Sequence, residues 1–285
     1  MLNSGFFGHI HGFSKVGKTF NALATLPGRI VYIMGEPRSI DRTLAAIKET
    51  GKEIELVKAV SPNDYNTPAD VREILIGLLT KEANKYDSLF FDGYSYFMNE
   101  FTGGLLEDDY YASRKVGDVK RKLGGQTARD GQVYGSLFSE MIRVFGLLGK
   151  IAMSGKVVIV ASLSKTINQT KKTAGIGGKI EISTDPKFFE LMRILNIDGT
   201  HLKSFTVPAF DGLKFLDEYP GIVDAIGYVE KPRDEMGKLI YPSYPPTVSF
   251  ESLDDDYLAT WSGPLLKKTK GLLNWKAILG IKKGG

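Results

Sequence analysis

The 285-residue sequence contains no cysteine and only three histidines. The lack of cysteine excludes disulfides, thiolate catalysis and Cys-based zinc sites. Long apolar runs are also missing, since the longest, such as residues 157–163, are far shorter than the roughly 20 residues that a membrane-spanning helix needs. We therefore expect a cytoplasmic protein with no membrane partner, and a metal, if one binds, held by oxygen atoms.

Neither sign of charge dominates the sequence. Thirty-seven Lys and Arg stand against 33 Asp and Glu, which gives a net charge of +4. This small surplus does not by itself indicate a nucleic-acid partner, so that question depends on where the basic residues lie. A hydrophobic content of 42% over this length is enough to form one large core.

Short apolar runs alternate with helical patterns over the first 163 residues. Strands are expected at 6–10, 30–34, 53–60, 88–92 and 156–163, and helices at 18–24, 40–49, 68–83 and 133–153. Because parallel neighbours need crossover helices, this order predicts an α/β fold with a doubly wound, mostly parallel sheet and helices on both faces. Ligands of such sheets bind where the strands end.

The character of the sequence changes after Leu163. Residues 164–179 read as a polar, Gly-rich loop, and shorter β-like runs follow at 203–208 and 222–230. We expect a core over residues 1–230 and a small, β-rich C-terminal extension with a basic tail over 231–285. The tail contains Trp275 among its lysines, and either binding to DNA or a partner, or a disordered solubilising end, would explain it.

One motif is specific. The sequence G-x-x-x-x-G-K-[ST] lies between an expected strand and an expected helix, which is the context of a phosphate-binding P-loop. Its glycines let backbone N–H groups approach phosphates, and its lysine and threonine are expected to contact the β- and γ-phosphates and Mg²⁺. The expected ATP-binding residues are Gly12, Phe13, Ser14, Lys15, Val16, Gly17, Lys18 and Thr19.

Three polar strand ends add candidate roles. Asp92 ends an apolar strand and is expected to hold Mg²⁺ together with Thr19. Glu36 follows the strand after the P-loop helix. In a sheet where that strand neighbours the P-loop strand, its carboxylate could orient or deprotonate the attacking water; the alternative is that Glu36 is an acidic residue at a helix start. Ser162 and Ser164 either sense the γ-phosphate or satisfy backbone groups.

Basic residues gather in one stretch without acids. Between residues 165 and 179 stand Lys165, Lys171, Lys172 and Lys179, directly after a strand end expected to face the nucleotide. Such a segment suits the phosphates of single-stranded DNA, although a solvated loop has the same composition. A second basic segment, 114–129, is diluted by acids. His9 and His11 alternate on one strand face, but because a third ligand is missing nearby we interpret them as packing residues.

Glu36, Asp92 and the polar strand end at 162–165 together resemble the RecA-type core ATPases. More closely, the chain is similar to the phage-encoded RecA-like ATPases of the Sak single-strand annealing group. Features similar to that group continue in residues 131–135, 207–211, 221–227 and 250–271. The resemblance implies a RecA-like P-loop NTPase core, a catalytic role for Glu36, and ATP-dependent recombination on single-stranded DNA in the host cytoplasm. It also implies self-assembly into a ring or filament and cooperation with a single-strand-binding protein. Ser162 or Ser164 stands where that group often has a histidine.

Other functions share the same motif. A helicase or packaging motor has the same core, and a small-molecule kinase would use 97–135 as lid and acceptor site. A GTPase is disfavoured because no N-K-x-D segment is present. A nucleotide-gated scaffold that does not hydrolyse ATP would make Glu36 structural.

Overall fold

The computed structural model describes residues 5–112, 131–172, 180–182, 200–210, 219–231, 246–251, 258–261, 266 and 269–281. The first half contains β1 (Phe6–Gly12), α1 (Lys18–Leu23), β2 (Arg29–Met34), α2 (Asp41–Glu49), β3 (Glu55–Val60), α3 (Pro68–Leu79), β4 (Ser88–Asp92), α4 (Tyr94–Tyr96), a π-helical turn (Phe97–Thr102), and α5 (Gly103–Ala112). The second half contains α6 (Gly131–Met153), β5 (Val157–Lys172), β6 (Ile180–Ile182), β7 (Thr200–Pro208), β8 (Ala225–Glu230), β9 (Thr247–Ser249), β10 (Thr260–Trp261), β11 (Lys270–Leu272) and α9 (Trp275–Ile278). Two 3₁₀ turns, Pro62–Asp64 and Tyr219–Gly221, complete the described elements.

The main sheet has the strand order β11-β9-β8-β1-β5-β4-β2-β3. All neighbours from β8 to β3 along this order are parallel, and at the other edge β9 and β10 pair antiparallel with β8. The α/β class with a mostly parallel sheet, expected from the alternating pattern, is therefore confirmed. Its central strands read as continuous apolar runs because both faces are covered.

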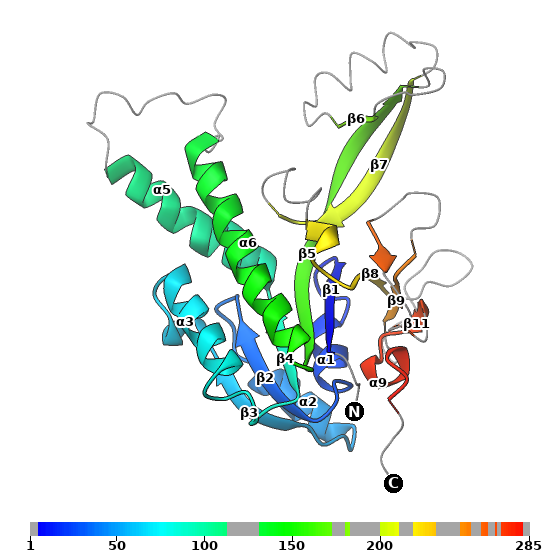
Figure 1. Cartoon of the computed structure of the whole chain (residues 1–285). Coiled ribbons are helices and arrows are strands. Elements are labelled where there is room, and N and C mark those ends of the chain that lie inside the picture. The colour runs from blue at the N-terminus through cyan, green and yellow to red at the C-terminus, as the bar shows by residue number, and fades with distance from the viewer. Residues whose placement is uncertain are drawn as a thin grey trace.

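Helices cover both faces of this sheet (Figure 1). Phe7 and Phe91 pack on the side of α3 and α6, whereas their chain neighbours Phe6 and Phe90 pack on the side of α1, α2 and α9. This alternation follows from the two-residue period of a strand. Helix α3 adds to the first layer with Val71, Leu75 and Leu78, which recur on one helical face. Among the described residues, no helix combines the length and the apolar character needed to cross a bilayer.

The strand order differs from the arrangement under which Glu36 was expected to reach the γ-phosphate. Strand β2, which leads to Glu36, does not neighbour the P-loop strand β1, because β5 and β4 lie between them. Instead, β2 pairs with β4, and Met34 is in register with Asp92. Glu36 therefore reaches the site from beside Asp92.

The prediction of a loop over 164–179 is wrong for residues 164–172. Strand β5 does not end at Leu163 but continues to Lys172, pairing antiparallel with β7 from Ser164 onward and with β6 near its end. The three strands form a ribbon that projects from the body of the sheet (Figure 1). The polar composition predicted a loop because the apolar period stops at Leu163, but strands that pair with one another satisfy their backbone groups without an apolar face.

The described C-terminal residues belong to the same sheet and core. Strand β9 pairs with β8, and β11 pairs with β9. Trp275 is fully buried, with ring centroids 6.0 Å from Phe6 and 6.1 Å from Phe250, and its backbone N–H donates to Thr25 Oγ1 at 3.2 Å. The Trp275 ring therefore belongs to the core, and binding of the basic tail to DNA or a partner stays a prediction. The boundary near residue 230 stays a prediction.

Candidate nucleotide site

The expected phosphate-binding loop joins the end of β1 to the start of α1. Lys15 and Gly17 have positive φ angles of 63° and 93°. Turns with such left-handed residues direct successive N–H groups to one side, which is how a backbone forms an anion-binding nest. A Cβ on Gly12 would lie 2.3 Å from the carbonyl oxygen of Val229 in β8, so the start of the loop has room only for glycine.

The side chains of the loop divide between solvent and the core. Phe13, Ser14 and Lys15 are exposed. Val16 packs against the cluster of buried residues beneath α1. The loop backbone, rather than these side chains, is thus the part suited to an anion.

Lys18 is held inside the loop that precedes it. Its Nζ donates to the carbonyl oxygens of Gly12 at 2.7 Å and of Phe13 at 2.9 Å, and the residue is only 8% exposed. Burial lowers the pKa of Lys18 to about 8, while Asp92 and Glu36 act in the opposite direction. The amino group is therefore close enough to both carboxylates to be influenced by their charge.

Thr19 and Asp92 meet directly. Thr19 Oγ1 donates to Asp92 Oδ2 at 2.6 Å, and Tyr32 in β2 donates its hydroxyl to the same oxygen at 3.1 Å. Asp92 is 3% exposed. Burial and then the Asp92 charge raise the pKa of Tyr32, so the phenol stays protonated and remains a donor. The carboxylate is thus fixed by neighbours from α1 and β2.

Glu36 lies against Gly93, the residue that follows Asp92. Gly93 has a φ of 71°, and a Cβ placed on it would stand 2.7 Å from Cγ of Glu36. Only glycine satisfies both the backbone angle and the close approach. The Glu36 side chain is 26% exposed, so water can reach it.

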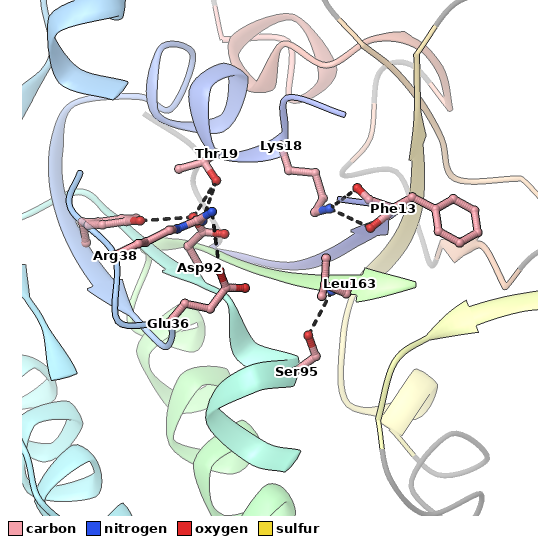
Figure 2. A network of polar contacts seen from close by, with 10 residues as sticks. Phe13, Lys18, Thr19, Glu36, Arg38, Asp92, Ser95 and Leu163 are labelled. Carbon is pink, nitrogen blue, oxygen red and sulfur yellow. Dashed lines mark hydrogen bonds and ion pairs between the residues drawn. The ribbon is translucent and has the colours of Figure 1, made fainter. Parts of the chain in front are cut away.

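Arg38 completes the cluster, and the sequence analysis missed it. Its guanidinium donates to Thr19 Oγ1 at 3.0 Å, forms a close ion pair with Asp92, and stands 3.5 Å from Glu36 Oε2 (Figure 2). Burial disfavours the charged form, but Asp92 and then Glu36 outweigh it and raise the pKa of Arg38. The tight turn around Pro37, closed by the Arg38 N–H donating to the Glu36 carbonyl at 2.9 Å, returns the side chain to the site. An arginine two residues after the acid was the only hint in the sequence.

The oxygens of Thr19 and Asp92 suit Mg²⁺, provided that a nucleotide supplies further ligands. Thr19 and Asp92 present oxygens close together, and the cationic guanidinium already drawn to them shows that the place attracts positive charge. Within the described residues no three His, Asp or Glu side chains gather as a metal cluster. An ion here would need phosphate oxygens and water to complete its coordination.

Ser162 and Ser164 contact the two histidines of β1. Ser162 Oγ lies 2.8 Å from His9 Nε2, and Ser164 Oγ lies 2.9 Å from His11 Nδ1. Because side chains alternate, Leu163 is the β5 residue on the other face, in register with Gly12 where the loop begins. Both hydroxyls are thus engaged with the histidines, and their role as γ-phosphate sensors stays a prediction.

The histidines themselves are packing residues with satisfied rings. His9 Nδ1 lies 3.3 Å from the Tyr219 hydroxyl, and His11 Nε2 lies 2.6 Å from the Leu258 carbonyl. Burial lowers the pKa of His9 well below its ordinary value and that of His11 to about 4. Both are therefore neutral at physiological pH.

Three of the four lysines expected to bind DNA lie in the ribbon strand β5. Lys165 is near its base, where its amino group bonds to the carbonyl oxygen of Phe210. Lys171 and Lys172 are the last residues of β5. Lys179 and the basic segment 114–129 lie outside the described residues, as do Lys267, Lys268, Lys282 and Lys283 of the tail.

A phosphate loop between β1 and α1, with an acidic residue ending the parallel strand β4, defines the P-loop NTPase class of α/β folds. No protein-family model matches the chain, and no curated protein matches it in sequence. A solved structure of a KaiC-like protein from the hyperthermophilic archaeon Pyrococcus horikoshii OT3 is similar at 10% identity and a TM-score of 0.39, over 86% of this chain and 78% of that one. The class rests on the loop and topology of the chain itself.

Proposed function

We propose that the chain is a RecA-like, Mg²⁺-dependent ATPase that acts on single-stranded DNA. The observation that carries the ATPase is that three separate segments meet at the carboxyl ends of the parallel strands: the start of α1 with Lys18 and Thr19, the end of β4 with Asp92, and the turn after β2 with Glu36. These residue types supply a phosphate contact, two metal ligands and a base. One of these residues could lie there by chance. All four together, at the carboxyl ends of the parallel strands, are the residue types that phosphoryl transfer requires.

Binding begins at the loop. The backbone N–H groups of residues 12–19 receive the phosphates, and Lys18 exchanges its two carbonyl partners for β- and γ-phosphate oxygens. Thr19 and Asp92 would hold Mg²⁺, which would supply positive charge to neutralise those oxygens. Exchange of neutral carbonyls for anionic phosphates strengthens the bonds of a charged amine.

Hydrolysis then requires a group that positions water. Glu36 is the acid at this edge that is partly exposed and is not held by the threonine and tyrosine hydroxyls that fix Asp92. A carboxylate in this place orients the attacking water and accepts its proton.

The first prediction tests this role. Glu36→Gln should retain ATP binding but reduce hydrolysis by about 10²- to 10⁴-fold, because the amide cannot accept the proton. Glu49→Gln, at the exposed end of α2, is the matched control and should leave turnover unchanged. Turnover would be measured by phosphate release and binding by a fluorescent ATP analogue. Normal turnover in the Glu36 variant would make this residue structural.

Single-stranded DNA is proposed as the partner. The sequence resemblance to phage annealing ATPases supports it, and so does the ribbon, whose strand β5 starts beside the P-loop strand and ends at Lys171 and Lys172. A basic segment joined to a nucleotide-bearing strand is suited to contact phosphates in a way that depends on ATP. We also propose assembly into a homo-oligomer, ring or filament, that cooperates with a single-strand-binding protein.

The deciding experiment is steady-state ATP hydrolysis by the purified chain, with and without a single-stranded oligonucleotide. Lys18→Ala provides the blank, since it removes the phosphate contact. Stimulation by DNA supports the proposal, and hydrolysis indifferent to DNA favours a kinase or another motor. Absence of hydrolysis would indicate a nucleotide-gated scaffold. Sedimentation of the same samples tests assembly, and a strictly monomeric chain would exclude the ring or filament.

A further inference from the structure

Arg38 stands where the proposed metal site needs a cation. Its guanidinium contacts the hydroxyl of Thr19 and the carboxylates of Asp92 and Glu36 (Figure 2). Thr19 and Asp92 are the residues expected to hold Mg²⁺, and Glu36 is the expected base. One side chain therefore contacts both expected metal ligands and the expected base.

The charges of the cluster balance with Arg38 in place. Lys18 and Arg38 carry two positive charges, and Asp92 and Glu36 carry two negative charges. A buried carboxylate such as Asp92 is costly without a partner, so the ion pair with Arg38 stabilises it. A divalent ion arriving next to the guanidinium would be repelled, since like charges a few ångströms apart in a partly buried site are screened only weakly.

We propose that Arg38 is an internal placeholder cation, which occupies the metal position before nucleotide binds and must leave it when the Mg²⁺ complex arrives. The inference rests on the proposed function, because it assumes that Thr19 and Asp92 are the metal ligands. With Arg38 in this position, a divalent ion binds only together with the nucleotide, and free Mg²⁺ does not occupy the site by itself.

The surroundings of Arg38 allow such a movement. Its side chain is 45% exposed, in contrast to the 4% of the Asp92 side chain. A hollow of about 470 Å³ beside it is lined by Pro37, Ile40, Asn63 and Asp41. Asp41 is an exposed acid whose carboxylate accepts from the Ser39 hydroxyl at 2.7 Å. The displaced guanidinium thus has space, and a further acid, Asp41, at the start of α2 three residues along the chain.

The second prediction concerns binding of Mn²⁺, as a spectroscopic substitute for Mg²⁺, to the full chain without nucleotide. Arg38→Gln removes the charge while keeping a long polar side chain, so one Mn²⁺ should bind about tenfold or more tightly than in the wild type. Arg42→Gln changes an exposed arginine one turn further on and should leave Mn²⁺ binding unchanged. Electron paramagnetic resonance measures the decrease of the free Mn²⁺ signal in a titration.

A double variant identifies the ligands. Arg38→Gln with Asp92→Asn should lose the gained site, whereas Mn²⁺ affinity that persists in it would overturn the proposal. Equal affinity in the wild type and Arg38→Gln would also overturn it. If circular dichroism shows that Arg38→Gln does not fold, Arg38→Lys provides the same comparison. Lysine lacks the planar, bidentate guanidinium, so the Mn²⁺ affinity of this variant should lie between those of the wild type and Arg38→Gln. Because this readout needs no turnover, an inactive ATPase with the expected Mn²⁺ pattern refutes the proposed hydrolysis and leaves the placeholder intact.

Discussion

Gly93 and Pro37 show how single residues shape the acidic side of the site. Gly93 adopts a left-handed angle and leaves room for Glu36 to lie on its backbone, while Pro37 restricts the turn that returns Arg38 toward Asp92. Neither residue has a side chain that does chemistry. Their contribution is to let two charged side chains from one short turn reach the end of β4.

At the same scale, the two buried histidines make stability depend on pH. His11 is enclosed by Ser164 and the Leu258 carbonyl, with the rings of His9 and Tyr228 and the charge of Lys18 nearby. Its pKa is about 4 in the fold against 6.5 for a free histidine. The unfolded chain therefore takes up protons first as the pH falls, so the contribution of the neutral ring is complete above pH 6.5 and is lost progressively toward pH 4.

The third prediction follows from this difference. The free energy of unfolding of the wild type should fall between pH 7 and pH 4.5, with His11 contributing on the order of 2 kcal/mol to the fall. His11→Gln should be less stable at pH 7, because a buried hydrogen-bonded ring is removed, yet its stability should decline less over the same interval. Urea unfolding at several pH values measures both. Parallel pH profiles for the two proteins would contradict the assignment.

At the scale of elements, β5 joins two parts of the molecule. Its first half lies between β1 and β4 in the sheet, and its second half forms the ribbon with β7. The change occurs at the P-loop edge, where Leu163 is in register with Gly12 and Ser164 begins the pairing with β7. A displacement of the P-loop strand would therefore act directly on the base of the ribbon.

The fourth prediction concerns this ribbon and the residues that follow it. Neutralising Lys171, Lys172 and Lys179 to Gln should weaken binding to single-stranded DNA and flatten its dependence on salt, by about 0.7 in the log–log slope for each phosphate that is no longer neutralised. Lys48 and Lys52 supply the control, because both are exposed near the edge where β3 begins, away from the P-loop. Fluorescence anisotropy over a range of salt concentrations gives the slopes. An unchanged slope would remove these lysines from the DNA site.

At the scale of the whole molecule, segments from the two ends of the described chain pack against each other. Strand β1 near the start of the chain and helix α9 near the end of the described residues share one buried cluster, in which Trp275 lies against Phe6 and Phe250. The bond from its backbone to Thr25 ties the same helix to the segment after α1. The described residues beyond 246 therefore stabilise the layer that supports the phosphate loop.

The fifth prediction measures this support. Trp275→Ala should lower the free energy of unfolding by about 3–5 kcal/mol, since it removes a large, fully buried side chain. Met153→Ala, at a position that is 87% exposed, should change it by less than about 0.5 kcal/mol. Chemical denaturation followed by circular dichroism compares the two. A Trp275 variant as stable as the wild type would show that the C-terminal residues are dispensable for the core.

Local patterns in the sequence determined the P-loop, the apolar strands around it and Asp92 at the end of β4, because turn chemistry and strand periodicity act between residues close in the chain. They also determined the parallel α/β class, since strands separated by helices leave few alternatives. The strand order, and with it the route by which Glu36 reaches Asp92 through β2 and β4, was decided only by the tertiary structure.

The same holds for Arg38, for the extension of β5 and for the burial of Trp275. Arg38 acquires its role from groups on α1 and β4, β5 is extended by β7 far along the chain, and Trp275 is covered by β1. Each depends on partners distant in sequence, which no local pattern encodes. Nearby residues thus determined what chemistry the chain is suited for, and long-range packing decided which side chains meet to perform it.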